Sequence, residues 1–414
     1  MDRIRGSEIT SLPAGLSPAM SAANRRDEWT LLAVMWLFGF LIAAFQILPA
    51  GILRVIMDAV GVGPAAAGLF VGASLAGQAA ANVPVGVAID RTSSRIVIVV
   101  GAAAMGIAGI AAQQAGLAGS YPGLIGAIAL GGLGIAAIIT AGANLIGSVF
   151  AGDTEATAVA IFLTSPPAGY AVGQVTGPTV ATRFGWPTNF LVFGLLTTVL
   201  VVPFWYFSRG FGAEADPPTL AEFRRLIANR HLWIVSAMSF VAYSLYLLFN
   251  SWMPTYLADS FGLSLARSGL YAALFPATGI LARAGGGIIS DRLFDRKRRP
   301  VALIAFASVL PVVVLVAVIQ IPVVLALLLL PAGFFVQLGI GLFYTYIREV
   351  VSAPVTGTAL AVLGLVSFVG AFSAPTIAGV LIERTASYLP AFGYAGALAV
   401  IGISLAIIAP EPNP

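Results

Sequence analysis

Two six-residue stretches, Gly86-Val-Ala-Ile-Asp90-Arg91 and Gly287-Ile-Ile-Ser-Asp291-Arg292, decide how this chain is organised. They stand 201 residues apart, and each follows a long apolar run. A second pair of matching stretches, 157–160 (Thr-Ala-Val-Ala) and 358–361 (Thr-Ala-Leu-Ala), repeats at the same offset. A repeat of this length predicts two halves with the same fold, inserted in the same orientation.

The composition excludes a soluble fold. Of the 414 residues, 59% are hydrophobic and only 9% are charged, whereas soluble domains usually carry about 25% charged residues. The chain has no cysteine and one histidine, His231, so thiol chemistry is absent and we expect no metal site. The sequence shows no paired carboxylates, phosphate-cradling loop or ATPase motif. We therefore expect no enzyme, no cofactor and no nucleic-acid partner.

Apolar runs of about 20 residues are long enough to cross a bilayer as helices. The predicted spans of the first half are 29–53, 65–89, 95–117, 122–149, 156–182 and 187–208, and those of the second half are 231–257, 266–290, 300–319, 322–347, 354–382 and 387–409. The predicted fold class is an all-α integral membrane protein, with twelve transmembrane helices in two six-helix bundles related by a pseudo-two-fold axis.

The predicted bundles, 29–208 and 231–409, are flanked by an N-terminal tail (1–28) and a C-terminal tail (410–414). Between them lies a polar linker, 209–230, in which Leu220, Phe223, Leu226 and Ile227 fall at helical spacing. This spacing predicts a short amphipathic helix at the membrane surface.

The distribution of Arg and Lys predicts the orientation, because short cytoplasmic loops are enriched in both. With the N-terminus inside, sixteen basic residues fall on the inner side, and Arg54, Arg183, Arg267 and Arg384 fall on the outer side. We therefore predict cytoplasmic termini.

The Gly-x-x-x-Asp-Arg loops resemble those of the major facilitator superfamily of secondary transporters. The resemblance covers essentially the whole chain after residue 28, although Ser94 stands where the first loop often carries a glycine. It implies a monomer in the inner or plasma membrane that moves a small-molecule substrate by alternating access. It also implies a cytoplasmic gate formed by Gly86, Asp90, Arg91, Arg95, Gly287, Asp291 and Arg292.

Arg283 is the ionisable residue that lies clearly inside a predicted span. It stands seven residues before the end of the predicted span 266–290, or about 10 Å along a helix. A charged side chain in the hydrocarbon region is costly, so such a residue marks a functional site by default. The planar guanidinium group of arginine is suited to binding a carboxylate or another oxyanion. The alternative is that Arg283 reaches toward the cytoplasm and braces the gate.

The position of Arg283 is similar to that of the anion-binding arginine in nitrate/nitrite porters, oxalate/formate exchangers and monocarboxylate transporters. Nitrate porters carry another arginine in the second helix, where this chain has Gln78 and Asn82. We therefore do not expect a true nitrate porter.

Further polar residues fall at midplane depth in both halves and could line a small pocket. For each of them, a hydrogen bond between helices is the alternative role. These candidates are Gln46, Gln78, Asn82, Asn144, Tyr170, Gln174, Tyr243, Tyr246, Asn250, Gln337 and Tyr344.

No acidic residue falls inside a predicted span, although proton-coupled transporters commonly use one. The pattern therefore favours uniport, exchange, or symport in which the anion itself brings the proton. The predicted function is transport of a small organic or inorganic anion, of the monocarboxylate kind, with Arg283 as counter-charge. Efflux of an amphipathic or weakly basic compound is the alternative within transport, and a membrane sensor without transport is the alternative from another class. The sequence leaves substrate identity, direction, and proton or counter-solute coupling open.

Overall fold

The computed structural model describes residues 18–150, 153–209, 226–351 and 356–411, and these hold helices and no strand. The helices are α1 (Pro18–Gly51), α2 (Leu53–Val60), α3 (Pro64–Arg91), α4 (Ser94–Leu117), α5 (Tyr121–Val149), α6 (Asp153–Leu163), α7 (Ser165–Phe184), α8 (Thr188–Val199), α9 (Val201–Phe207), α11 (Arg230–Phe261), α12 (Leu265–Ala277), α13 (Gly279–Leu293), α14 (Arg298–Val318), α15 (Pro322–Val350), α16 (Thr356–Thr385) and α17 (Leu389–Ile408).

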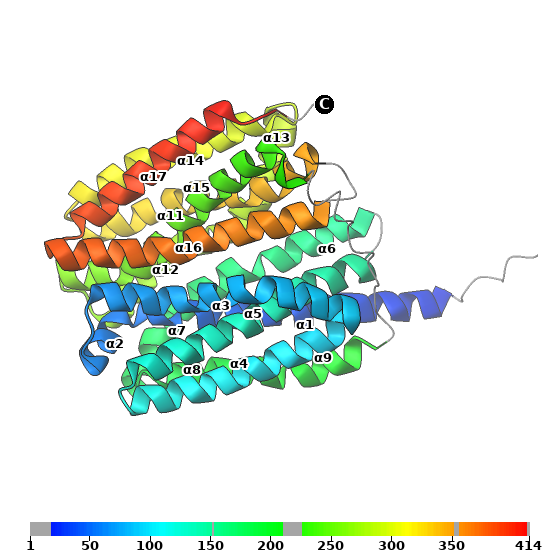
Figure 1. Ribbon diagram of the computed structural model, residues 1–414, viewed down its shortest axis with the longest axis horizontal. Helices are drawn as coiled ribbons and strands as arrows, with labels where there is room; N and C mark the ends of the chain where they lie inside the picture. The colour runs from blue at the N-terminus through cyan, green and yellow to red at the C-terminus, as the bar shows by residue number, and fades with distance from the viewer. Residues whose placement is uncertain (1–17, 151–152, 210–225, 352–355, 412–414) are drawn as a thin grey trace, which may run out of the picture.

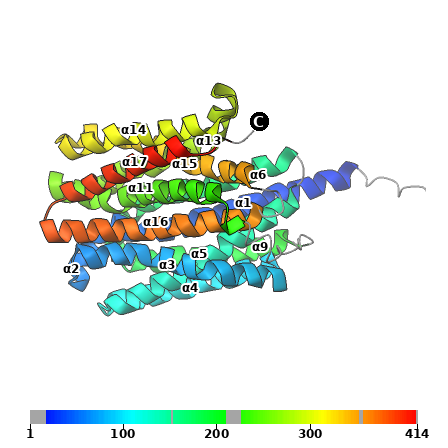
Figure 2. The ribbon, with the colours of Figure 1, turned by 45° about the horizontal axis from the view of Figure 1, so that its top comes forward.

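Two helical bundles lie side by side, with the first half of the chain in one and the second half in the other (Figures 1 and 2). In the first bundle α5 packs against α3 and α4, and α1 packs against α7. In the second bundle α14 packs against α15 and α17, and α11 packs against α16. Long helices of high hydropathy in this arrangement make the chain an integral membrane protein, as the composition predicts.

Eleven helices of the described residues are each long and apolar enough to cross a membrane. The remaining predicted span, 156–182, is divided into α6 and α7 at Thr164, two residues before Pro166. Proline lacks an amide hydrogen and disfavours a helical residue before it, so the helix breaks there. Together α6 and α7 make the twelfth crossing. A second break, at Thr278, divides the eighth predicted span into α12 and α13.

Close packing within the first bundle depends on glycine. A Cβ atom on Gly132 of α5 would lie 2.0 Å from the Ser74 carbonyl oxygen, and one on Gly77 of α3 would lie 2.1 Å from the Ala129 carbonyl oxygen. Small residues allow helix backbones to approach in this way in membranes. The contact holds α3 and α5 together as one wall of the bundle.

The two ends of the molecule carry different charged residues, Arg54 at one end and Arg298 at the other. The Arg54 face holds α2, the start of α3 and the end of α16, and the Arg298 face holds the starts of α4 and α14. The bundles meet through α3 with α16, α7 with α12, and α1 with α11.

Polar contacts join the two bundles at the Arg54 face. Arg54 Nη1 lies 2.6 Å from Asp259 Oδ1, and the Glu383 carboxylate accepts a 2.7 Å hydrogen bond from the Ala65 amide. The Cβ of an alanine at Gly68 would lie 2.4 Å from the Pro375 carbonyl oxygen, so α3 and α16 are in close contact just below this face. The bundles are therefore closed against each other at the Arg54 face.

The start of the first helix differs from the prediction, and the predicted linker helix lies partly outside the described residues. Helix α1 begins at Pro18, within the predicted tail 1–28, because the intervening residues include good helix formers such as Ala, Met and Arg. In the predicted linker helix, Leu226 and Ile227 are helical, while Leu220 and Phe223 lie outside the described residues.

Candidate substrate cavity

A cavity lies between the two bundles and encloses about 760 Å³ of empty space, part of it open to solvent. Helices of both bundles line it. Seven of the residues proposed from the sequence contribute to this lining, namely Gln46, Gln78, Tyr170, Tyr243, Tyr246, Arg283 and Tyr344. The structure thus brings together residues from α1, α3, α7, α11, α13 and α15 that are distant in the sequence.

Arg283 lies on α13, five residues after the break at Thr278, and its side chain is directed at Tyr246 in the cavity. The guanidinium carbon lies 5.3 Å from the centroid of the Tyr246 ring, which places the cation over the aromatic face. Its Nε atom is buried and has no hydrogen-bond partner among the described residues. No acidic side chain of the described residues lines the cavity. The cavity therefore offers a positive charge and a free donor.

Four tyrosines surround this cation. Tyr246 stacks on Tyr170 of the other bundle with ring centroids 5.4 Å apart and an interplanar angle of 18°. The Tyr243 and Tyr344 hydroxyls share a hydrogen bond of 3.1 Å between α11 and α15. The Tyr246 hydroxyl is buried without a partner in the described structure. The hydroxyls can donate to a carboxylate that also pairs with Arg283.

The other proposed binding residues lie outside the cavity lining. The Asn144 amide donates to Ser94 Oγ (2.9 Å), and the Gln174 amide donates to Asn250 Oδ1 (2.9 Å) across the two bundles. Asn82 is half-buried on α3. Asn144 and Gln174 thus join neighbouring helices, which is the alternative role stated for them.

Gln337 has a structural function at the break between α12 and α13. Its amide donates to the Phe275 carbonyl (3.2 Å) and the Pro276 carbonyl (3.3 Å). Both carbonyls precede Thr278, where the helix is interrupted, and unpaired carbonyls are costly in a membrane. Gln337 thus supports the break that precedes Arg283.

Sequence reasoning missed the apolar part of the wall. Phe162, Pro166 and Phe368 line the cavity beside the polar residues. Apolar residues are common throughout the spans, so nothing in the sequence distinguishes these from residues that face lipid.

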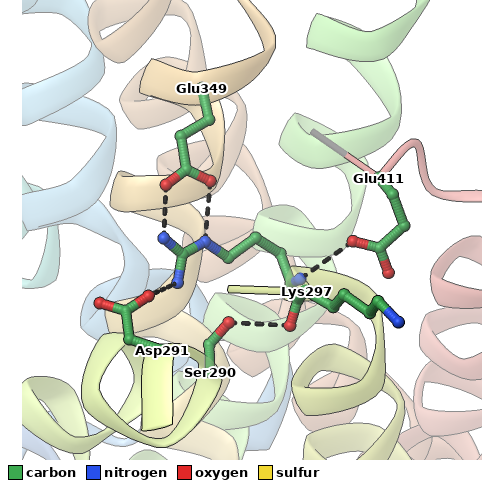
Figure 3. A network of polar contacts seen from close by, with 6 residues as sticks. Ser290, Asp291, Lys297, Glu349 and Glu411 are labelled. Atoms are coloured by element: carbon green, nitrogen blue, oxygen red, sulfur yellow. Dashed lines mark hydrogen bonds and ion pairs between the residues drawn. The ribbon is translucent and has the colours of Figure 1, made fainter. Parts of the chain in front are cut away.

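A charge network lies at the Arg298 face and includes Asp291 of the second loop motif (Figure 3). Arg298 Nη1 lies 2.6 Å from Asp291 Oδ1, and its Nε lies 2.7 Å from a Glu349 carboxylate oxygen, while Nη2 bonds the other oxygen. The Arg298 amide donates to Glu411 at 3.1 Å. The network joins α13, α14, α15 and the segment after α17. Sequence reasoning named Asp291 but missed Arg298 as its partner.

Among the remaining residues of the predicted gate, Arg95 contacts its own bundle, and Arg91 and Arg292 face solvent. Arg95 donates to Ser208 Oγ at 2.9 Å and its guanidinium lies 4.7 Å from the Trp205 ring centroid. Arg91 and Arg292 are exposed. Gly86 and Gly287 lie in α3 and α13, and the Asp90 side chain lies outside the described structure. The described contacts of Arg95 are with the first bundle, and those of Asp291 are with the second bundle.

Two six-span bundles around a shared cavity define a secondary transporter of the alternating-access kind. The model of the Major Facilitator Superfamily matches residues 35–375, and the chain belongs to this superfamily. Its members are transporters rather than enzymes, which confirms the prediction from the loop motifs.

Two curated relatives align over most of their length. The chain is 23% identical to a hexuronate transporter of Bacillus subtilis over 80% of this chain and 82% of the relative. It is 24% identical to a probable L-galactonate transporter of Escherichia coli over 78% of this chain and 76% of the relative. Among solved structures, a bacterial homologue of the human lysosomal transporter Spinster superposes with a TM-score of 0.74 at 17% identity, covering 95% of this chain and 96% of that one.

The Arg298 network predicts a loss of stability when its central cation is removed. The side chain of Arg298 is 4% exposed, and Arg298→Met leaves two carboxylates without their partner. Breaking a fully buried pair costs about 3–5 kcal/mol. We expect a smaller loss here, since Asp291 and Glu349 are partly solvated. The purified variant should melt at a lower temperature than the wild type, measured by thermal unfolding in detergent.

The matched control is Arg292→Met, which removes an exposed arginine next to the network. Its melting temperature should stay near that of the wild type. Equal melting temperatures for Arg298→Met and the wild type would show that the network does not hold the helix ends together.

Proposed function

We propose that this protein transports a small organic anion, of the monocarboxylate kind, and binds its carboxylate at Arg283. The observation that carries the proposal is a cavity between the bundles in which Arg283 has no acidic partner among the described lining residues. An unpaired guanidinium in a membrane interior is costly, and a carboxylate can pair with it through two parallel hydrogen bonds.

The neutral polar lining supports a substrate that also carries hydroxyl groups. Gln46, Gln78, Tyr243 and Tyr344 offer both donors and acceptors around the cavity. The two relatives described above are named for hexuronate and L-galactonate, which are hydroxylated monocarboxylates.

The apolar part of the wall favours a second candidate, efflux of an amphipathic compound. Phe162, Phe368 and Leu75 could contact an apolar group. The charge of Arg283 would repel a basic compound, so within this candidate a neutral or acidic amphipathic compound fits better. The anion-binding proposal accounts for both the charge and the free donor.

We also propose that the Arg298 face lies in the cytoplasm of a cell whose plasma membrane holds the protein as a monomer. The positive-inside rule supports this orientation, because Arg91, Arg95 and Arg292 lie with Arg298 at that face. Closure at the Arg54 face then corresponds to an inward-facing state. The predicted gate motif, 86–95 and 287–292, would act at this same cytoplasmic end.

Uptake by proteoliposomes tests the role of Arg283. We expect saturable uptake of radiolabelled glucuronate by the wild type, and a loss of at least about tenfold in Arg283→Gln, because a bidentate charged pair becomes a neutral hydrogen bond. Arg267→Gln makes the same change at an exposed position on α12 and should transport normally. If the wild type moves neutral or cationic compounds instead, and Arg283→Gln does likewise, the anion proposal fails.

Labelling with a membrane-impermeant maleimide tests the orientation, because the native chain has no cysteine. We expect Asp58→Cys, exposed at the Arg54 face, to react in intact cells. Lys297→Cys, exposed at the Arg298 face, should react only after the membrane is permeabilised. The opposite pattern would place the Arg298 face outside the cell.

A further inference from the structure

We propose that the first bundle binds an anionic phospholipid on its outer surface, where α4 meets α9 at the Arg298 face (Figure 1). The guanidinium groups of Arg95 and Arg209 hold the phosphate of the lipid headgroup. The acyl chains lie on the apolar surface that α4 shares with α8 and α9. This site is separate from the cavity between the bundles, because neither arginine lines that cavity, and it does not depend on which solute is transported.

Two arginines without acidic partners come together at the end of α9. Arg95, at the start of α4, donates from Nε to Ser208 Oγ at 2.9 Å and from Nη2 to the Trp205 carbonyl at 3.4 Å. Arg209 directly follows Ser208 in the chain. Neither arginine forms a salt bridge with a described carboxylate, whereas Arg298 at the same face has two carboxylate partners. The end of α9 therefore carries positive charge that no described residue neutralises.

An exposed aromatic ring lies against each of these arginines. The guanidinium carbon of Arg95 is 4.7 Å from the centroid of the Trp205 ring, and that of Arg209 is 5.7 Å from the centroid of the Tyr206 ring. The two aromatic residues are 45% and 64% exposed. Tryptophan and tyrosine are enriched at the level of lipid headgroups, and cation–π contacts hold both guanidinium groups at that level. Arginine binds phosphate oxygens through parallel hydrogen bonds, so the two cations are placed to receive a lipid phosphate.

The helix surfaces next to the arginines are apolar and exposed. Ile96 and Val100 lie one turn apart on the outer side of α4, and Val199 and Val202 lie at the end of α8 and the start of α9. Because α4 packs against α8 and α9, these exposed side chains belong to neighbouring helices. Acyl chains cover such surfaces in any membrane. The adjoining pair of unneutralised cations favours a lipid whose headgroup has a net negative charge over a zwitterionic lipid.

The alternative is that Arg95 only joins α4 to α9. That role does not explain Arg209, which is exposed and contacts the Tyr206 ring of its own chain segment. A headgroup phosphate explains the charge of both arginines.

The test measures lipid binding to the purified full chain by native mass spectrometry. Dioleoylphosphatidylglycerol and dioleoylphosphatidylcholine, which have the same acyl chains, are added in equal amounts. We expect the wild type to bind the first molecule of phosphatidylglycerol at least about tenfold more tightly than phosphatidylcholine, since a surface arginine near an anionic headgroup contributes about fivefold and two are present.

Two variants assign this preference to the site. In Arg209→Gln the preference should fall about fivefold, and this variant should fold normally because Arg209 is exposed. Adding Arg95→Gln should make the binding of the two lipids nearly equal. The matched control is Arg292→Gln, which removes an exposed arginine of the second bundle at the same face and should keep the wild-type preference.

Equal binding of the two lipids by the wild type would overturn the proposal, and so would an unchanged preference in Arg209→Gln. An equal loss of preference in Arg292→Gln would show that the net charge of the face acts, rather than this site. Inorganic phosphate added in tenfold excess should leave the bound phosphatidylglycerol in place, because it has no chains to contact α4 and α8. Displacement by phosphate would show that the arginines bind a free anion instead of a lipid.

Discussion

Arg283 is a cation without an acidic partner in the described lining of the cavity, and it lies between two bundles that have to separate during transport. Arg283 could be neutralised permanently by a carboxylate, yet none lies in the described lining of the cavity. A permanent ion pair would stabilise the empty site and compete with an anionic substrate. The chain instead leaves the guanidinium over Tyr246 with a free donor. In the function proposed above, an anion that pairs with Arg283 removes the cost of burying this charge.

The surrounding helices hold this cation in place without neutralising it. The break at Thr278 starts a new helix close to Arg283, and Gln337 bonds the carbonyls that precede the break. Charged contacts are kept to the two faces, where water reduces their cost. Arg54 with Asp259 joins the bundles at one face, and Arg298 with Glu349 joins helices of a single bundle at the other. Each bundle is braced within itself, and the two bundles meet through α3 with α16, α7 with α12, and α1 with α11.

The sequence predicted the twelve-span fold because span length and loop charge follow directly from the thickness and polarity of a bilayer. It also identified Arg283, since a charge inside an apolar run is rare, together with six polar residues that line the same cavity. It could not separate Gln46 and Gln78, which face the cavity, from Gln174 and Gln337, which bond other helices. All four are amides at similar depth, and only the rotation and packing of each helix distinguish them. Arg298 was missed because its partner Glu349 lies 51 residues away, on another helix.

Binding to the purified protein shows whether the positive charge of Arg283 recognises the carboxylate of the substrate. Isothermal titration calorimetry in detergent can compare glucuronate with glucose, which shares its ring and most of its hydroxyl groups but lacks the carboxylate. We expect measurable binding of glucuronate that weakens as salt is added, and no measurable binding of glucose. Equal affinity for the two sugars, unchanged by salt, would contradict it.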